Sequence, residues 1–470
     1  MKSLNGVYPS GQPLTGVGSA DALYHLHSQT NLQSHVTQGP LVMVRGEGPY
    51  VFDEQGKRYL EGMGGLWCAS LGFSDQRLVD AATIQMKKLP YYHTFNHRSS
   101  DTASMLAAKV ASLSPMPDPR VFFATSGSEA NDSMVKMAWS YHIARGEPAR
   151  RKIIARDRAF HGSTVMGASL SGLTNMHAAF GLPLEGIVRV ACPYPYRDAR
   201  EGESEISYVE RLVRDLEDRI AEEGAHTIAA FIAEPIIGAG GVIVPPAGYF
   251  EQVQQVLKRH GILMLADEII CGFGRTGNWF GSQTFGMTPD MMACAKGLSS
   301  GYAPISCVIV HGEVFETLQR HSGKTGGFGH GFTYSGHPLS AAVALEALAI
   351  YEEMDLPARS RHLGEVLHRE LGRLSDHPLV GDIRGTGFIA GIELVADKVG
   401  RMPFDATLGM GAQVERATRS HGLIVRSMGD VIALSPPYIL DDAQVVDMVA
   451  TLKLALDDVV ARNLLTAEVA

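Results

Sequence analysis

Two short apolar runs, each ending on a charged side chain, constrain the fold of this chain most strongly. They are Leu263–Asp267 and Met291–Lys296. An apolar run of this length between turn residues is typical of a buried strand, and in a parallel sheet the carboxyl ends of the strands face the ligand crevice. We therefore expect Asp267 and Lys296 at one edge of a buried sheet, either as a structural ion pair or as parts of a site.

The surrounding sequence alternates strands and helices. Short apolar runs predict strands at 121–124, 152–155 and 228–233, and apolar spacing predicts helices over 102–113, 126–144 and from 249 to near 261. This order indicates an α/β fold in which helices cover both faces of a mainly parallel sheet.

The two ends of the chain have a different pattern. Residues 42–61 predict two or three short strands in an antiparallel meander, preceded by an arm of about twenty residues and a short helix capped by Asp21. After Pro338 the sequence predicts helices over 339–354, 363–374, 408–420 and 441–458, a strand over 388–394 and a hairpin of 423–426 with 431–434. We expect residues 1–80 and 339–470 to form a small α+β domain beside a large domain, residues 81–338.

Composition excludes several classes of protein. The net charge of −9 argues against a nucleic-acid surface, and no apolar run approaches the ~18 residues that span a bilayer. The five cysteines form no C-x-x-C pair and the N-terminus has no secretory apolar region, so we expect a reduced, cytoplasmic protein. The 18 histidines show no metal spacing, His93 and His97 included, and no metal is expected.

Two glycine-containing motifs could bind phosphate. Thr125–Asn131 follows a strand and opens a helix, so its backbone N–H groups suit an anion, although an ordinary serine N-cap explains the same residues. Gly272–Gly277 matches G-x-G-x-x-G, but no helical period follows it, as a dinucleotide site would require. We expect these glycines to form a tight loop under the site.

Together, the acid, the lysine and the anion site favour pyridoxal phosphate over an ion pair. A lysine amine binds that cofactor covalently, and an acid pairs with its pyridinium nitrogen. A lysine that ends an apolar run is partly desolvated, which lowers its pKa and favours the free amine.

With these motifs in this order, the sequence resembles the class III aminotransferases, which are fold type I pyridoxal-phosphate enzymes. The matching segments are Leu66–Cys68, Ser126–Asp132, Phe160–Thr164, Ala233–Gly241, Asp267–Gly277, Ala295–Gly297 and Gly331–Pro338. Within the class it is most similar to the omega-aminotransferases, which use amines or omega-amino acids with pyruvate. The resemblance implies a seven-stranded sheet between helices and ping-pong transamination.

The resemblance also implies roles for single residues. Lys296 would bind the cofactor and then act as general base and acid, and Asp267 would pair with the ring nitrogen. The remaining cofactor contacts would come from Ser126, Gly127, Ser128, Phe160, His161, Glu234, Ile269 and Thr333. Among these, Phe160 would stack on the ring in place of the tyrosine of many relatives, and Ile269 would pack on its other face. Thr333 would reach the phosphate of the neighbouring subunit, which makes a homodimer with active sites at its interface part of the expectation; pairing of dimers into a tetramer stays open.

For the substrate, the resemblance implies a pocket lined by Trp67 and Phe95, with Arg426 clamping a carboxylate. The alternative for Arg426 is an exposed strand arginine. Asn96 stands where relatives that accept bulky aromatic amines often carry a second aromatic residue, which hints at a more polar substrate. Ala239 stands where ornithine- and 4-aminobutyrate-type relatives usually carry Glu, which favours pyruvate as the acceptor.

Two other functions remain open from the sequence. A pyridoxal-phosphate aminomutase or decarboxylase would use the same fold and lysine. A cofactor-binding protein without turnover is disfavoured by the intact Lys296 and Asp267.

Overall fold

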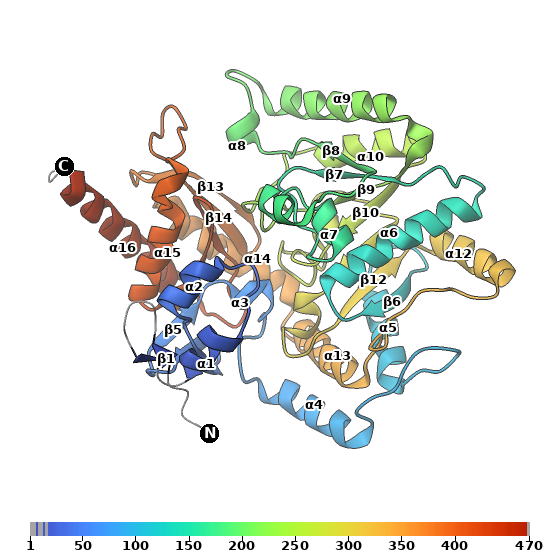
Figure 1. Ribbon diagram of the computed structural model, residues 1–470, viewed down its shortest axis with the longest axis horizontal. Helices are drawn as coiled ribbons and strands as arrows, with labels where there is room; N and C mark the ends of the chain where they lie inside the picture. The colour runs from blue at the N-terminus through green and yellow to red at the C-terminus, as the bar shows by residue number, and fades with distance from the viewer. Residues whose placement is uncertain (1–5, 8–12, 15–16, 468–470) are drawn as a thin grey trace.

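Seven strands form the central sheet of the computed structural model, which describes residues 6–7, 13–14 and 17–467 (Figure 1). In spatial order they are β6 (Arg120–Ala124), β12 (Ser306–Val310), β11 (Met291–Cys294), β10 (Leu263–Asp267), β9 (Ile228–Ala233), β7 (Lys152–Arg156) and β8 (Ile187–Val190). Only β12 runs antiparallel to its neighbours. The predicted, mainly parallel sheet is therefore confirmed.

Helices cover both faces of this sheet because successive strand residues point to opposite sides. On β10, Leu263 and Leu265 belong to one buried cluster, whereas Met264 and Ala266 belong to another. The first cluster includes α6 (Gly127–Ala144) and α12 (Gly312–Thr325); the second includes α9 (Glu205–Glu223), α10 (Tyr249–His260), α13 (Pro338–Glu353) and α5 (Asp101–Leu113). The charged ends of β10 and β11 are thus fixed by two packed layers.

The smaller half of the molecule contains two four-stranded sheets. One is β13 (Val380–Thr386), β14 (Ile389–Leu394), β17 (Val431–Leu434) and β16 (Arg426–Met428); the other is β15 (Leu423–Ile424), β5 (Arg58–Glu61), β4 (Tyr50–Asp53) and β3 (Met43–Glu47). Because β15 pairs with β5, segments from both chain ends share one sheet. The chain therefore forms a small domain from both of its ends, as predicted.

The remaining elements connect or flank these layers. They are the strands β1 (Gly6–Val7) and β2 (Pro13–Leu14) and the helices α1 (Val17–Tyr24), α2 (Leu32–Gln38), α3 (Gly64–Trp67), α4 (Gln76–Lys88), α7 (Val165–Leu170), α8 (Pro195–Asp198), α11 (Gly281–Thr284), α14 (Leu356–Gly372), α15 (Met410–Ser420) and α16 (Asp442–Ala467). Helix α13 packs on α4 and α5 of the larger half, so the boundary at residue 338 stays a prediction. No helix among the described residues is long and apolar enough to span a membrane.

Two sequence predictions about local structure were wrong. Asp21 does not cap a helix that follows it; it lies inside α1, and its carboxylate accepts hydrogen bonds from histidines instead of a backbone N–H. Residues 423–424 do not join the predicted hairpin but pair with β5, where the Leu60 N–H donates to the Gly422 carbonyl and the Gly62 N–H donates to the Ile424 carbonyl. The hairpin begins at Arg426. The predicted arm lies largely outside the described residues.

Candidate active site

The two charged strand ends meet as the sequence predicts. Strands β10 and β11 are parallel neighbours, with Asp267 opposite Ala293, and Lys296 follows β11 at the start of a short 3-10 helix. Lys296 has a left-handed backbone (φ 44°) and a partly buried side chain. Burial lowers the pKa of its amine, and nearby charges such as that of Asp267 oppose that effect. The amine is thereby shifted toward the unprotonated, nucleophilic form.

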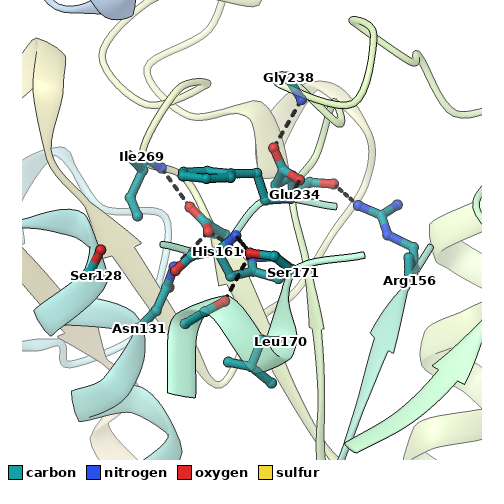
Figure 2. A network of polar contacts seen from close by, with 12 residues as sticks. Ser128, Asn131, Arg156, His161, Leu170, Ser171, Glu234, Gly238 and Ile269 are labelled. Atoms are coloured by element: carbon teal, nitrogen blue, oxygen red, sulfur yellow. Dashed lines mark hydrogen bonds and ion pairs between the residues drawn. The ribbon is translucent and has the colours of Figure 1, made fainter. Parts of the chain in front are cut away.

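Asp267 is held by three donors rather than by Lys296. Figure 2 labels the residues that provide them, Asn131, His161 and Ile269. Asn131 Nδ2 donates to Oδ2 at 2.7 Å, His161 Nδ1 lies 2.8 Å from the same oxygen, and the Ile269 N–H donates to Oδ1 at 3.1 Å. No ion pair joins Lys296 to Asp267 in the described part of the chain. The simple ion-pair interpretation of the two strand ends is therefore wrong, and the carboxylate is oriented for another group.

Asn131 belongs to the site, although the sequence did not predict a role for it. It lies one turn into α6, is fully buried, and also donates to the His161 carbonyl at 2.8 Å. The sequence did offer one indication, because Asn131 lies within the Ser126–Asp132 motif. A side chain so close to the N-terminus of a helix that follows a strand can reach the ends of the neighbouring strands. Asn131 Oδ1 and His161 Nε2 are buried without a hydrogen-bond partner.

Glu234, at the end of β9, orders the loop that carries Phe160. Its Oε1 accepts the Phe160 N–H at 3.0 Å and its Oε2 accepts the Gly238 N–H at 2.9 Å. Burial raises the pKa of Glu234, and the nearby His161 opposes that rise. The carboxyl is thus occupied by backbone donors, which gives Glu234 a positioning role on Phe160.

The start of α6 carries the residues of the predicted anion site. Ser126 is the N-cap and accepts the Glu129 N–H at 3.2 Å, and Ser128 Oγ accepts the Ser163 N–H at 3.0 Å. Gly127 lets Ile269 approach, since a Cβ there would lie 2.7 Å from Ile269 Cδ1. The serine N-cap is therefore confirmed, and the anion site at the same helix N-terminus stays a prediction.

These residues fit pyridoxal phosphate. The helix N-terminus suits its phosphate, the fixed carboxylate of Asp267 suits a protonated ring nitrogen, and the Lys296 amine can bond to its carbonyl carbon. Ile269 supplies an apolar surface next to Gly127. The unpartnered Asn131 Oδ1 and His161 Nε2 leave further polar atoms around Asp267.

Trp67, Lys296 and Arg426 come together around one indole ring. Lys296 Nζ lies 5.8 Å and Arg426 Cζ lies 5.1 Å from the centroid of the same Trp67 ring. Trp67 is buried with a left-handed backbone (φ 59°), and its Nε1 has no partner. A single indole therefore borders both the reactive amine and a guanidinium.

Phe95 and Thr333 lie in a second group of residues. Phe95 packs against Gly331, and the Tyr91 hydroxyl donates to the Thr333 carbonyl at 3.0 Å. Phe95 and Gly331 line an open cleft of about 1130 Å³ together with Phe122 and Phe328. Phe95 and Thr333, the two predicted site residues of this group, are exposed on the surface of the single chain.

The Gly272–Gly277 loop does not form a dinucleotide site. Gly274 (φ 96°) and Gly277 (φ 90°) turn the chain tightly, and side chains there would meet Leu356 and Arg361 of α14. Only the short α11 follows. The glycines allow this loop to pack closely against α14 as a tight, buried turn.

The fold and the site define a fold type I pyridoxal-phosphate enzyme, and comparisons with known proteins identify its family. A family model for class III aminotransferases matches residues 32–456. The chain belongs to the class III aminotransferases and catalyses pyridoxal-phosphate-dependent transamination.

Similar proteins include gamma aminobutyrate transaminase 3 of Solanum lycopersicum, 46% identical over 89% of this chain and 81% of that protein. Vanillin aminotransferase of Capsicum frutescens is 43% identical over 89% and 92%. The omega transaminase of Pseudomonas jessenii, solved in complex with PMP, is 48% identical with a TM-score of 0.93, covering 95% of this chain and 98% of that one. These relatives are transaminases, and none of them favours an aminomutase or decarboxylase.

Proposed function

We propose that this aminotransferase moves an amino group from an amine or omega-amino acid to pyruvate and that Arg426 binds the substrate carboxylate. The observation that carries the proposal is the state of Arg426. It is partly buried against Trp67, burial lowers its pKa, and no ion pair neutralises it among the described residues. A partly buried, unpaired guanidinium gains most from a bidentate carboxylate.

The position of Arg426 relative to Lys296 supports a substrate that carries both an amine and a carboxylate. The two cationic groups border the same indole ring, so a short omega-amino acid can place one end at each. An uncharged amine requires no contact with Arg426, which can then turn toward solvent. This arrangement accommodates both donor classes.

Lys296 is the residue that moves the proton. Burial lowers the pKa of its amine, which favours the neutral form that a general base needs. Pyridoxal phosphate, when bound, supplies an electron sink for the carbon that loses the proton. Asn131 and His161 hold the Asp267 carboxyl group in one orientation, in which it would face the ring nitrogen.

Ala239 supports pyruvate as the acceptor. It packs with Ile236 and Val242 in the apolar cluster that contains Trp67, and it brings no carboxylate there. An acid in that place would add a negative charge to the cluster whose Trp67 ring Arg426 contacts. With alanine, Arg426 stays free for the single carboxylate of pyruvate.

Steady-state assays with a donor panel test this proposal. The donors are beta-alanine, 4-aminobutyrate, taurine, putrescine and 1-phenylethylamine, each with pyruvate or 2-oxoglutarate. We expect pyruvate-dependent alanine formation, rather than an isomer or carbon dioxide, and a higher kcat/KM with pyruvate. A preference for 2-oxoglutarate would overturn the acceptor assignment.

A variant pair tests Arg426 separately. Arg426→Leu is expected to raise KM for pyruvate and 4-aminobutyrate by about 10- to 100-fold, because a hydrogen-bonded charge contributes roughly 1.5–3 kcal/mol. The half-reaction with 1-phenylethylamine should change little. Arg419→Leu, at an exposed arginine at the end of α15, is the control. Equal effects of the two variants would contradict the assignment.

We further propose a homodimer in which Thr333 and Phe95 complete the neighbouring active site. Support comes from the exposed aromatic residues around these positions: Tyr91, Tyr92, Phe95, Phe328 and Tyr334 are each at least 38% exposed. Such a surface is costly to leave in water and favours a partner. A dimer by light scattering is expected. Mixed dimers of Lys296→Ala and Thr333→Ala subunits should regain activity that neither homodimer has.

A cytoplasmic location is also proposed. All five cysteines are free thiols and four of them are buried, which suits a reducing compartment. Fractionation of the source cells with antibody detection tests this location. Recovery in an organelle or membrane fraction would contradict it.

A further inference from the structure

Four side chains converge between the two N-terminal helices α1 and α2. Figure 1 labels these two helices. The carboxylate of Asp21 lies 3.1 Å from His25 Nδ1, 2.8 Å from His27 Nε2 and 3.0 Å from His35 Nε2. Three imidazole nitrogens therefore surround one carboxylate. The sequence spacing alone did not reveal this cluster, because His35 joins it from the second helix.

Three of the four residues already have ligand atoms close enough for one ion. Those of Asp21, His25 and His27 all lie within 4.8 Å of one another. The rings of His27 and His35 stack with centroids 3.9 Å apart, so both direct Nε2 at the same carboxylate. Tetrahedral zinc with bonds of about 2.0–2.1 Å holds its ligand atoms roughly 3.4 Å apart. Zinc binding therefore requires the side chains to rotate toward that geometry, that of His35 included.

We propose that Asp21, His25, His27 and His35 form a structural Zn²⁺ site that fastens α1 to α2. Three imidazoles and one carboxylate, without thiolate, are a ligand set that zinc accepts. Four protein ligands leave no open coordination position, which is the arrangement of a structural and not a catalytic zinc.

Packing explains why these helices need a metal. Helices of seven or eight residues are not stable alone in water and depend on tertiary contacts. His35 is the only buried residue of α2, and the buried residues of α1 are the small Gly18 and Ser19. The larger apolar side chains of both helices are exposed: Val17, Leu23, Tyr24, Leu32 and Val36. The polar cluster, rather than an apolar core, is what the two helices share.

The exposure of the ligands also suits metal entry. The His35 side chain is 7% exposed and forms the floor of the cluster, whereas the His25 side chain is 67% exposed. The cluster is therefore open to solvent on the side of His25, from which an ion can enter.

Zinc binding to the untagged holoenzyme tests the site. After treatment with a chelator and gel filtration, the protein is titrated with Zn²⁺ and its bound metal is measured by mass spectrometry. We expect one zinc per subunit in the wild type. The double variant His27→Gln/His35→Gln should bind at least about 100-fold more weakly, because it loses two direct ligands.

Matched controls separate this site from ordinary surface histidines. His362 and His421 each contact a single carboxylate, of Asp442 and Asp458, at 2.8 Å. The control variant His362→Gln/His421→Gln should bind zinc as the wild type does. Wild-type binding no tighter than that of the His27/His35 variant would overturn the proposal, as would equal loss in the control variant.

Proteolysis reports the fastening role itself. Zinc should slow cleavage within residues 25–35 of the wild type by about tenfold or more, since it stabilises only the folded form. It should not slow cleavage of the His27/His35 variant. Equal cleavage rates of the wild type with and without zinc would overturn the fastening role.

Discussion

Asn131 offers the most direct test of how the protein orients Asp267. The change Asn131→Ala removes a 2.7 Å hydrogen bond to a buried carboxylate and a 2.8 Å hydrogen bond to the His161 carbonyl. A hydrogen bond to a charged group contributes roughly 1.5–3 kcal/mol and a neutral one roughly 0.5–1.5 kcal/mol. The expected loss in the free energy of unfolding is therefore about 2–4 kcal/mol.

Urea unfolding of the apoprotein measures this loss without the contribution of the cofactor. Asn278→Ala is the matched control, because its amide donates to a neutral hydroxyl, Thr284 Oγ1, at 2.9 Å in a partly buried place. That variant should lose only about 0.5–1.5 kcal/mol. A third variant, Asn131→Asp, replaces the donor by a second carboxylate next to Asp267 and should be at least as unstable as Asn131→Ala.

The same variants connect stability to function. Asn131→Ala should also weaken pyridoxal phosphate binding, because Asp267 loses one of its three donors, whereas Asn278→Ala should not. If Asn131→Ala cost no more than Asn278→Ala, or if Asn131→Asp were as stable as the wild type, the argument that these donors hold a charged Asp267 would be refuted.

Two further predictions concern burial and close packing. Burial raises the pKa of Glu268 from 4.5 to about 7, so the unfolded chain loses its proton first as the pH rises. Glu268 therefore lowers the free energy of unfolding by up to about 3 kcal/mol between pH 4.5 and 7, and Glu268→Gln should flatten that part of the profile in urea titrations at several pH values. Gly127→Ala places a Cβ 2.7 Å from Ile269 Cδ1 and should weaken cofactor binding in fluorescence titrations. Adding Ile269→Val, which removes Cδ1, should restore it, and an unrescued double variant would contradict the close-packing explanation.

Much of the fold was predictable because local pattern and burial agree. The apolar runs ending at Asp267 and Lys296 are buried strands of the central sheet, since only apolar side chains fit between two helix layers. The start of α6 was also predictable, because a serine that follows a strand and precedes a helical pattern is typical of an N-cap. The pairing of residues 423–424 with β5 was not, because a two-residue strand carries no periodic signal.

The site residues at the ends of strands were predictable from the sequence. The contacts between segments that are distant in the sequence were not. Lys296 and Asp267 stand at strand ends, so their approach follows from a parallel sheet. The contact of Asn131 with Asp267 depends on how α6 packs across the strands, which no spacing encodes. The convergence of His35 on Asp21 likewise depends on a turn between two short helices.

The central claim is that the Lys296 amine holds the cofactor and moves the proton of transamination. Borohydride reduction of the holoenzyme, followed by peptide mass spectrometry, tests the claim most directly. We expect one pyridoxyl group per subunit on the peptide that contains Lys296, and no multiple-turnover transamination in Lys296→Ala. A label on another lysine, or wild-type turnover in Lys296→Ala, would contradict the account.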